Sequence, residues 1–125
     1  MNANARNAYM GQMVETASPA RLLVMLYDRL VLDINRGIEA QGAGDREKAN
    51  TNLIHAQEIV LELRSSLKLD AWEGAERLAS LYAWLHSELV RANISKDVEV
   101  TRGCLKLVEP LAEAWREAAQ LSLAG

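Results

Sequence analysis

Phenylalanine is absent from this sequence of 125 residues, and proline, cysteine and the other aromatic residues are scarce. Proline occurs only as Pro19 and Pro110, whereas leucine and alanine are abundant, and this composition favours helices over strands. Cys104 is the only cysteine, so no disulfide can form within the chain, and a reducing compartment is expected. We therefore expect an all-α protein located in the cytoplasm.

Long apolar runs are also missing. The run at residues 22–26 is far shorter than the ~20 residues that a membrane-spanning helix requires. Residues 1–9 are small and polar and no apolar signal-peptide core follows them, so we expect neither export by that route nor membrane insertion. The 14 basic and 17 acidic residues are scattered, whereas nucleic acid requires a basic stripe, so no nucleic-acid partner is expected.

The clearest helix signal covers residues 18–41. Ser18 is a favoured N-cap, and Pro19 stands at the first helical position, where its missing N–H costs nothing. Leucine and isoleucine then recur at three- and four-residue spacing until two glycines end the helix. Asp45 caps a second helix, expected over about residues 46–67, whose apolar residues keep a heptad spacing.

Two further helices follow. Asp70 with Glu73 resembles a capping box and predicts a third helix that ends at about residue 92. Ser95 or Asp97 can cap the last helix, which Pro110 should kink or split in two.

Four helices of similar length joined by short loops make antiparallel neighbours. The sequence therefore predicts an all-α, antiparallel up-down-up-down four-helix bundle over residues 18–125, with a Pro-kinked last helix. Residues 1–17 carry a few apolar side chains among Asn, Gly and Gln, and we expect them to form a mobile N-terminal arm.

The first three helices carry apolar residues beyond the single stripe that a bundle buries. An exposed apolar patch of more than a few hundred Å² usually marks an interaction surface, so this surplus suggests grooves for another chain. The alternative is that the helices bury wide faces. The surplus residues are Val24, Met25, Val31 and Leu32, then Ile54, Ile59 and Leu61, then Trp84 and Val90.

Patterns for metal binding and catalysis are missing as well. His55 and His86 are the only histidines, and only His55 has a carboxylate, Glu58, at the spacing of a metal-ligand pair. A di-metal bundle site needs Glu-x-x-His on two helices and further glutamates, so we expect no metal and no other cofactor. No nucleophile turn or phosphate-binding loop occurs, so we do not expect an enzyme.

Two alternative functions stay open for such a bundle. It could be a histidine phosphotransfer or signalling module, although residues 56–58 lack the Lys-Gly pair that follows the histidine in that family. It could instead be a homo-oligomeric structural bundle whose surplus apolar faces are self-contacts.

Several blocks of the sequence together form a recognisable pattern. They are Ala8-Tyr9, Val14-Glu15-Thr16-Ala17-Ser18-Pro19 and Leu22-Leu23-Val24-Met25-Leu26-Tyr27-Asp28, of which the last two together are specific, followed by shorter matches from Gly44-Asp45 to Trp115. These blocks resemble the flagellar secretion chaperone family, the FliS-like, flagellin-specific export chaperones. Two departures are visible, Arg29 in place of a small residue and residues 72–75 in place of a glycine-rich stretch. Neither lies on the bundle seam, although groove details and the favoured client can differ.

The resemblance implies a cytoplasmic export chaperone that binds the disordered C-terminal segment of flagellin. It would prevent premature polymerisation and deliver flagellin to the flagellar type III secretion apparatus. Clients of such chaperones resemble helices laid on outer apolar grooves, with the N-terminal arm moving aside. The sequence leaves open a second partner, such as an export-gate component or a flagellar regulator.

We combine the surplus apolar residues with this resemblance to predict a partner-binding surface. For Tyr27 and Tyr82 the alternative is the core, with their hydroxyl groups bonded at the edge of the bundle. The predicted partner-binding residues are Tyr9, Met13, Ser18, Pro19, Met25, Tyr27, Ile54, Gln57, Leu61 and Tyr82.

Overall fold

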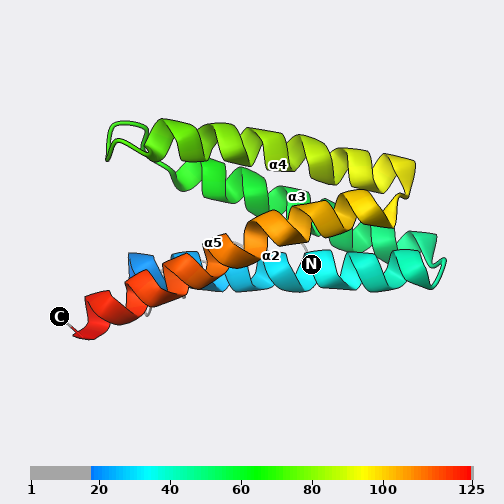
Figure 1. The fold of residues 1–125 in the computed structure, drawn as a ribbon, viewed down its shortest axis with the longest axis horizontal. Coiled ribbons are helices and arrows are strands. Elements are labelled where there is room, and N and C mark those ends of the chain that lie inside the picture. Colours follow the sequence, from blue (N-terminus) through cyan, green and yellow to red (C-terminus); the bar gives the residue numbers. More distant parts are fainter. Residues whose placement is uncertain (1–17, 125) are drawn as a thin grey trace, which may run out of the picture.

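The structure, a computed structural model, describes residues 18–124, with side chains up to residue 121. Each helix of this part runs opposite to the one before it, and the last helix packs back on the first (Figure 1). This arrangement confirms the predicted all-α, up-down-up-down bundle. The predicted arm lies outside the described residues and stays a prediction. The four helices are α2 (Pro19–Gly42), α3 (Arg46–Ser66), α4 (Ala75–Ser95) and α5 (Val98–Ala124).

Side-chain caps fix the starts of α2 and α3. The hydroxyl of Ser18 accepts the backbone N–H of Arg21 at 3.2 Å, and the carboxylate of Asp45 accepts the backbone N–H of Lys48 at 3.1 Å. Gly44 adopts a φ of 73°, which glycine reaches without strain, and thereby turns the chain between the two helices. Both caps were predicted from the sequence.

The start of α4 and the interior of α5 differ from the sequence prediction. The capping box at Asp70 is wrong, because α4 begins only at Ala75 and has no side-chain cap. In α5 the helix continues through Pro110, so the predicted split does not occur. Pro110 cannot donate a hydrogen bond to the carbonyl four residues earlier, and it is exposed. The predicted kink stays a prediction.

The core runs along the axis of the bundle. Gly37 lets α2 and α3 approach closely, because a Cβ atom at this position would lie only 2.7 Å from a methyl carbon of Leu53. Ile59, which the sequence assigned to the surplus face, is buried, so α3 buries a wider face than one stripe. The largest fully buried apolar side chains are Tyr27, Leu30, Ile34, Leu53, Val60, Leu63, Leu85, Leu89 and Val108.

Candidate partner-binding site

An apolar hollow of about 300 Å³ opens at the end of the bundle where α2 begins. All four helices contribute to it, because the starts of α2 and α4 and the later parts of α3 and α5 meet at this end. Its apolar lining consists of Pro19, Leu22, Leu23, Leu26, Leu63, Leu67, Leu78, Tyr82 and Trp115, with Glu62 and Ser66 as the polar residues. Such a lining offers burial to an apolar side chain of another segment.

Two tyrosines join α2 and α4 beside this hollow. The hydroxyl groups of Tyr27 and Tyr82 share a hydrogen bond of 2.7 Å, and the ring of Trp115 lies 6.5 Å from that of Tyr27. Burial raises the pKa of both tyrosines above its ordinary value, so both hydroxyl groups stay protonated.

The exposure of the two tyrosines decides how they can contribute to binding. Tyr27 is 0% and Tyr82 2% exposed, which places both in the core, the alternative that the sequence left open. A partner could touch the ring of Tyr27 only if the helices moved apart. Tyr82 lines the hollow but presents very little surface to it.

Three predicted residues of α3 form a row on the outside of the bundle. Ile54 is 41% and Leu61 53% exposed, and their spacing of seven residues, two helical turns, places them on the same side of α3. Asn50 accepts a hydrogen bond from the side-chain amide of Asn93 at 2.8 Å, which identifies the flank of α3 that faces α4. Half-buried Gln57 lies seven residues after Asn50 on that flank. We call Ile54, Gln57 and Leu61 the α3 row; it lies on the side of α3 toward α4.

The remaining predicted residues lie elsewhere. Ser18 is exposed and its hydroxyl serves as the cap of α2, while Pro19 lines the hollow. Met25 is half-buried on α2 and belongs neither to the hollow nor to the α3 row. Tyr9 and Met13 lie outside the described residues. The predicted residues within residues 18–121 therefore lie in several places: the core, the hollow, the α3 row and the half-buried side of α2 at Met25.

The sequence prediction missed several residues of the hollow. Leu22, Leu23 and Leu26 share the spacing of the core stripe, so periodicity alone cannot distinguish them from buried residues. They become half-exposed because the bundle ends beside them. Only the position of α2 relative to the ends of α3 and α5 reveals this.

His55, considered above as a phosphotransfer or metal residue, is held by Asp33. Its Nδ1 atom shares a short hydrogen bond with the carboxylate of Asp33, which is fully buried between α2 and α3. Nε of Arg29 lies 3.2 Å from the other carboxylate oxygen, at ion-pair distance but not aligned for a hydrogen bond. His55 thus links two helices. Within residues 18–121, no three His, Cys, Asp or Glu side chains are grouped so that they could hold a metal ion.

Comparison with known proteins gives a consistent result. The model of the family described as "Flagellar protein FliS" matches residues 1–122. The flagellar secretion chaperone FliS of Bacillus subtilis (strain 168) is 32% identical over 117 residues, which cover 94% of this chain and 87% of that protein. The protein of the same name from Vibrio cholerae serotype O1 is 24% identical over 103 residues, or 82% and 76% of the two chains.

A solved structure confirms the fold. A crystal structure of a bacterial flagellar chaperone superposes with a TM-score of 0.75 at 18% identity, and the match covers 93% of this chain and 98% of that one. None of the helices in residues 18–124 is long and apolar enough to cross a membrane. The matched family consists of chaperones, which confirms the prediction that the chain is not an enzyme. This chain therefore belongs to the FliS family and has a chaperone role in flagellar export.

Proposed function

We propose that this chain is a cytoplasmic export chaperone for the disordered C-terminal segment of flagellin. It prevents premature polymerisation and delivers flagellin to the flagellar type III secretion apparatus. The observation that carries the proposal is the apolar hollow at the start of α2, found in a member of a chaperone family. A segment that buries apolar side chains in a filament tends to aggregate before assembly, and a surface of this kind covers those side chains.

The α3 row supplies a surface on which such a segment can lie as a helix. A helix that docks in a groove presents apolar residues at positions i, i+3, i+4 and i+7, and Ile54 and Leu61 repeat with the same period of seven residues. Gln57 places an amide between them for a hydrogen bond with a polar group of the client. Leu61 directly precedes Glu62 at the edge of the hollow, so one client segment can reach both surfaces.

Residues 1–17 form the arm of this proposal. Pro19 lines the hollow, so the chain that precedes it joins the bundle at the rim of the hollow. Tyr9 and Met13 are apolar enough to occupy the hollow until a client displaces them. Binding of the client and docking of the arm are then mutually exclusive.

The proposed compartment and partners follow from the same features. Cys104 is a free thiol in the core, which suits the reducing cytoplasm, and burial raises its pKa to about 11. Besides flagellin, an export-gate component or a flagellar regulator fits the surfaces that the client leaves uncovered. Nucleic acid is not among the proposed partners.

Calorimetric titration of the full chain with a flagellin C-terminal peptide tests this function. Coupled folding and binding that buries roughly 1,000–3,000 Å² should give a clearly negative heat-capacity change. Leu61→Glu should weaken binding at least about tenfold, because it places a charge in the client groove. Leu121→Glu is the matched control, because Leu121 is 74% exposed on α5 and belongs neither to the lining of the hollow nor to the α3 row.

Two results would count against the proposal. One is the absence of binding by a folded chain. The other is equal affinity of the Leu61→Glu and Leu121→Glu variants, which would show that the α3 row does not hold the client. Sedimentation with and without the peptide separates this function from self-association through the same apolar surfaces.

A further inference from the structure

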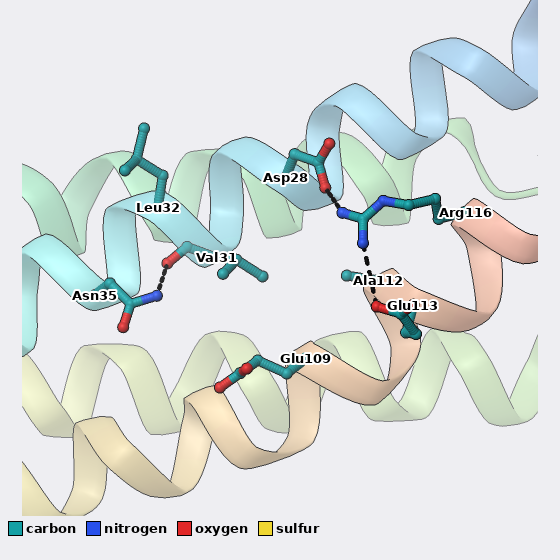
Figure 2. Close-up of a pocket in the computed structure, with 8 residues that line it drawn as sticks. All are labelled: Asp28, Val31, Leu32, Asn35, Glu109, Ala112, Glu113 and Arg116. Carbon is teal, nitrogen blue, oxygen red and sulfur yellow. Dashed lines mark hydrogen bonds and ion pairs between the residues drawn. The ribbon is translucent and has the colours of Figure 1, made fainter.

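A second hollow, of about 360 Å³, lies in the groove between α2 and α5, midway along both helices. Figure 2 shows Val31 and Ala112 directed into the space between the two helices. Leu32, which is 39% exposed, lines the same hollow from α2. We call these three residues the apolar floor. None of them lines the hollow at the start of α2, so the two sites are separate.

The rim of this groove is acidic. Asp28, Glu109 and Glu113 contribute three carboxylates and Arg116 one guanidinium, so the lining has a net charge of 1 − 3 = −2. Arg116 already pairs with Asp28 across the groove and with Glu113 at 3.1 Å, which places this ion-pair network at one end (Figure 2). No ion pair to Glu109 is found among the described residues.

The side chain of Asn35 supplies a second hydrogen-bond acceptor on the opposite side of the groove from Glu109. The helices are antiparallel and Asp28 meets Arg116, so seven residues further along the groove Asn35 of α2 lies across from Glu109 of α5. The side-chain nitrogen of Asn35 donates to the carbonyl of Val31 at 3.1 Å, which leaves its side-chain oxygen as an acceptor. A carboxylate and an amide oxygen therefore flank the open end of the groove, next to the apolar floor.

We propose that this groove binds a cationic amphipathic helix of another polypeptide. A lysine or arginine of that helix donates to Glu109 and Asn35, and an aliphatic side chain one turn away packs on the apolar floor. Residues one turn apart on a helix are ~5–6 Å apart on the same face, so one helix can make both contacts. The charge favours approach of a basic segment and raises its association rate.

Other occupants fit the groove less well. A metal ion or a polyamine would use the carboxylates but leave the apolar floor exposed to water. A second copy of this chain would bring the same acidic rim to a symmetric contact, and the two rims would repel each other. A helix that is wholly apolar would leave the charge of Glu109 without a partner.

The probe for this inference is a short helical peptide with leucine and arginine four residues apart. Its control peptide carries glutamate in place of arginine. Titrated into the isotope-labelled full chain, the arginine peptide should shift amide resonances along α2 and α5 around the groove, and the glutamate peptide should not. Shifts confined to the hollow at the start of α2, or equal binding of both peptides, would overturn the inference.

Substitutions at exposed positions complete the test. Glu109→Gln should lower the affinity for the arginine peptide about threefold, and adding Leu32→Gln should lower it further. The effect of Glu109→Gln should be smaller at high salt. Glu117→Gln is the matched control, because Glu117 is an exposed carboxylate of α5 outside the groove, and it should leave the affinity unchanged. An equal loss in both glutamate variants would indicate general charge attraction and overturn the site.

Two further measurements exclude the competing occupants. In sedimentation, any self-association of the full chain should be unaffected by Leu32→Gln. Self-association that Leu32→Gln abolishes would assign the groove to a second copy of this chain. A chain that starts at Ser18 should bind the arginine peptide as the full chain does. Tighter binding by the shortened chain would show that residues 1–17 fill the groove, contrary to the proposal.

Discussion

The hydroxyl groups of Tyr27 and Tyr82, 55 positions apart in the sequence, share a hydrogen bond of 2.7 Å inside the bundle. We expect Tyr82→Phe to lower the free energy of unfolding by ~1–3 kcal/mol, because the buried hydroxyl of Tyr27 loses its partner. The double change Tyr27→Phe/Tyr82→Phe should cost less than the sum of the single changes, because no hydroxyl is then left unsatisfied. Urea unfolding of the four proteins measures this difference, and simple additivity would contradict it.

The same pair predicts a loss of stability at alkaline pH. Burial raises the pKa of both tyrosines in the folded chain, so above pH ~10 the unfolded chain releases protons that the folded chain retains. The unfolded state is then favoured, and the free energy of unfolding falls as pH rises further. The double phenylalanine variant should show a shallower decline between pH ~10 and ~11. Identical slopes would mean that other groups cause the decline.

Gly37 and Gly103 form a matched pair of glycines within helices. Gly37→Ala should destabilise the bundle by ~1–3 kcal/mol, because the new methyl group would lie 2.7 Å from fully buried Leu53. Gly103→Ala should stabilise it by ~0.5–1 kcal/mol. A Cβ atom at this position would meet nothing within 4 Å beyond the backbone of its own helix, and alanine favours the helix. Thermal unfolding of both variants gives the sign of each change. A stabilising Gly37→Ala would show that α2 and α3 can separate freely.

The contact between Asp33 and His55 should matter for stability. His55→Ala removes the side chain that shares a hydrogen bond with the fully buried carboxylate of Asp33, and Arg29 remains at ion-pair distance. We therefore expect a loss of ~1–3 kcal/mol. The double change His55→Ala/Asp33→Asn should lower the free energy of unfolding by less than the sum of the two single changes. A double-mutant cycle by urea unfolding measures this coupling, and a coupling of zero would show that the contact contributes nothing.

Local signals in the sequence predicted the elements of the fold well. Some of these signals act within a few residues, so their effect can be read directly from the sequence. They are the cap at Ser18, the proline at the next position and the glycine at position 44. The start of α4 was misplaced because a capping box at Asp70 is a local signal that the surrounding loop overrides. Pro110 leaves α5 unbroken because the helix packs on the bundle and Pro110 lies on its exposed side, where one missing hydrogen bond is tolerated.

The candidate sites depend on tertiary structure and were predicted only in part. Ile54 and Leu61 could be found because they fall off the core stripe of α3. The leucines of the hollow share the stripe of the core and are exposed only because the bundle ends there. The acidic groove joins Asp28 of α2 to residues of α5 that are more than eighty positions away, and no periodicity within one helix indicates that pairing.

Residues 1–17 should compete with the client for the hollow at the start of α2. If the arm covers the hollow ~90% of the time, only about a tenth of the molecules can accept a client, and the apparent affinity falls about tenfold. A chain that starts at Ser18 should therefore bind a flagellin C-terminal peptide up to about ten times more tightly than the full chain. It should also self-associate more readily, because the apolar hollow is then uncovered. Tyr9→Ala should change affinity in the same direction but by less, because the rest of the arm still competes. The measurement is the dissociation constant of the peptide for each chain, with circular dichroism to establish that the shortened bundle is folded. Weaker binding by a folded, shortened chain would mean that the arm holds the client in place and does not compete with it.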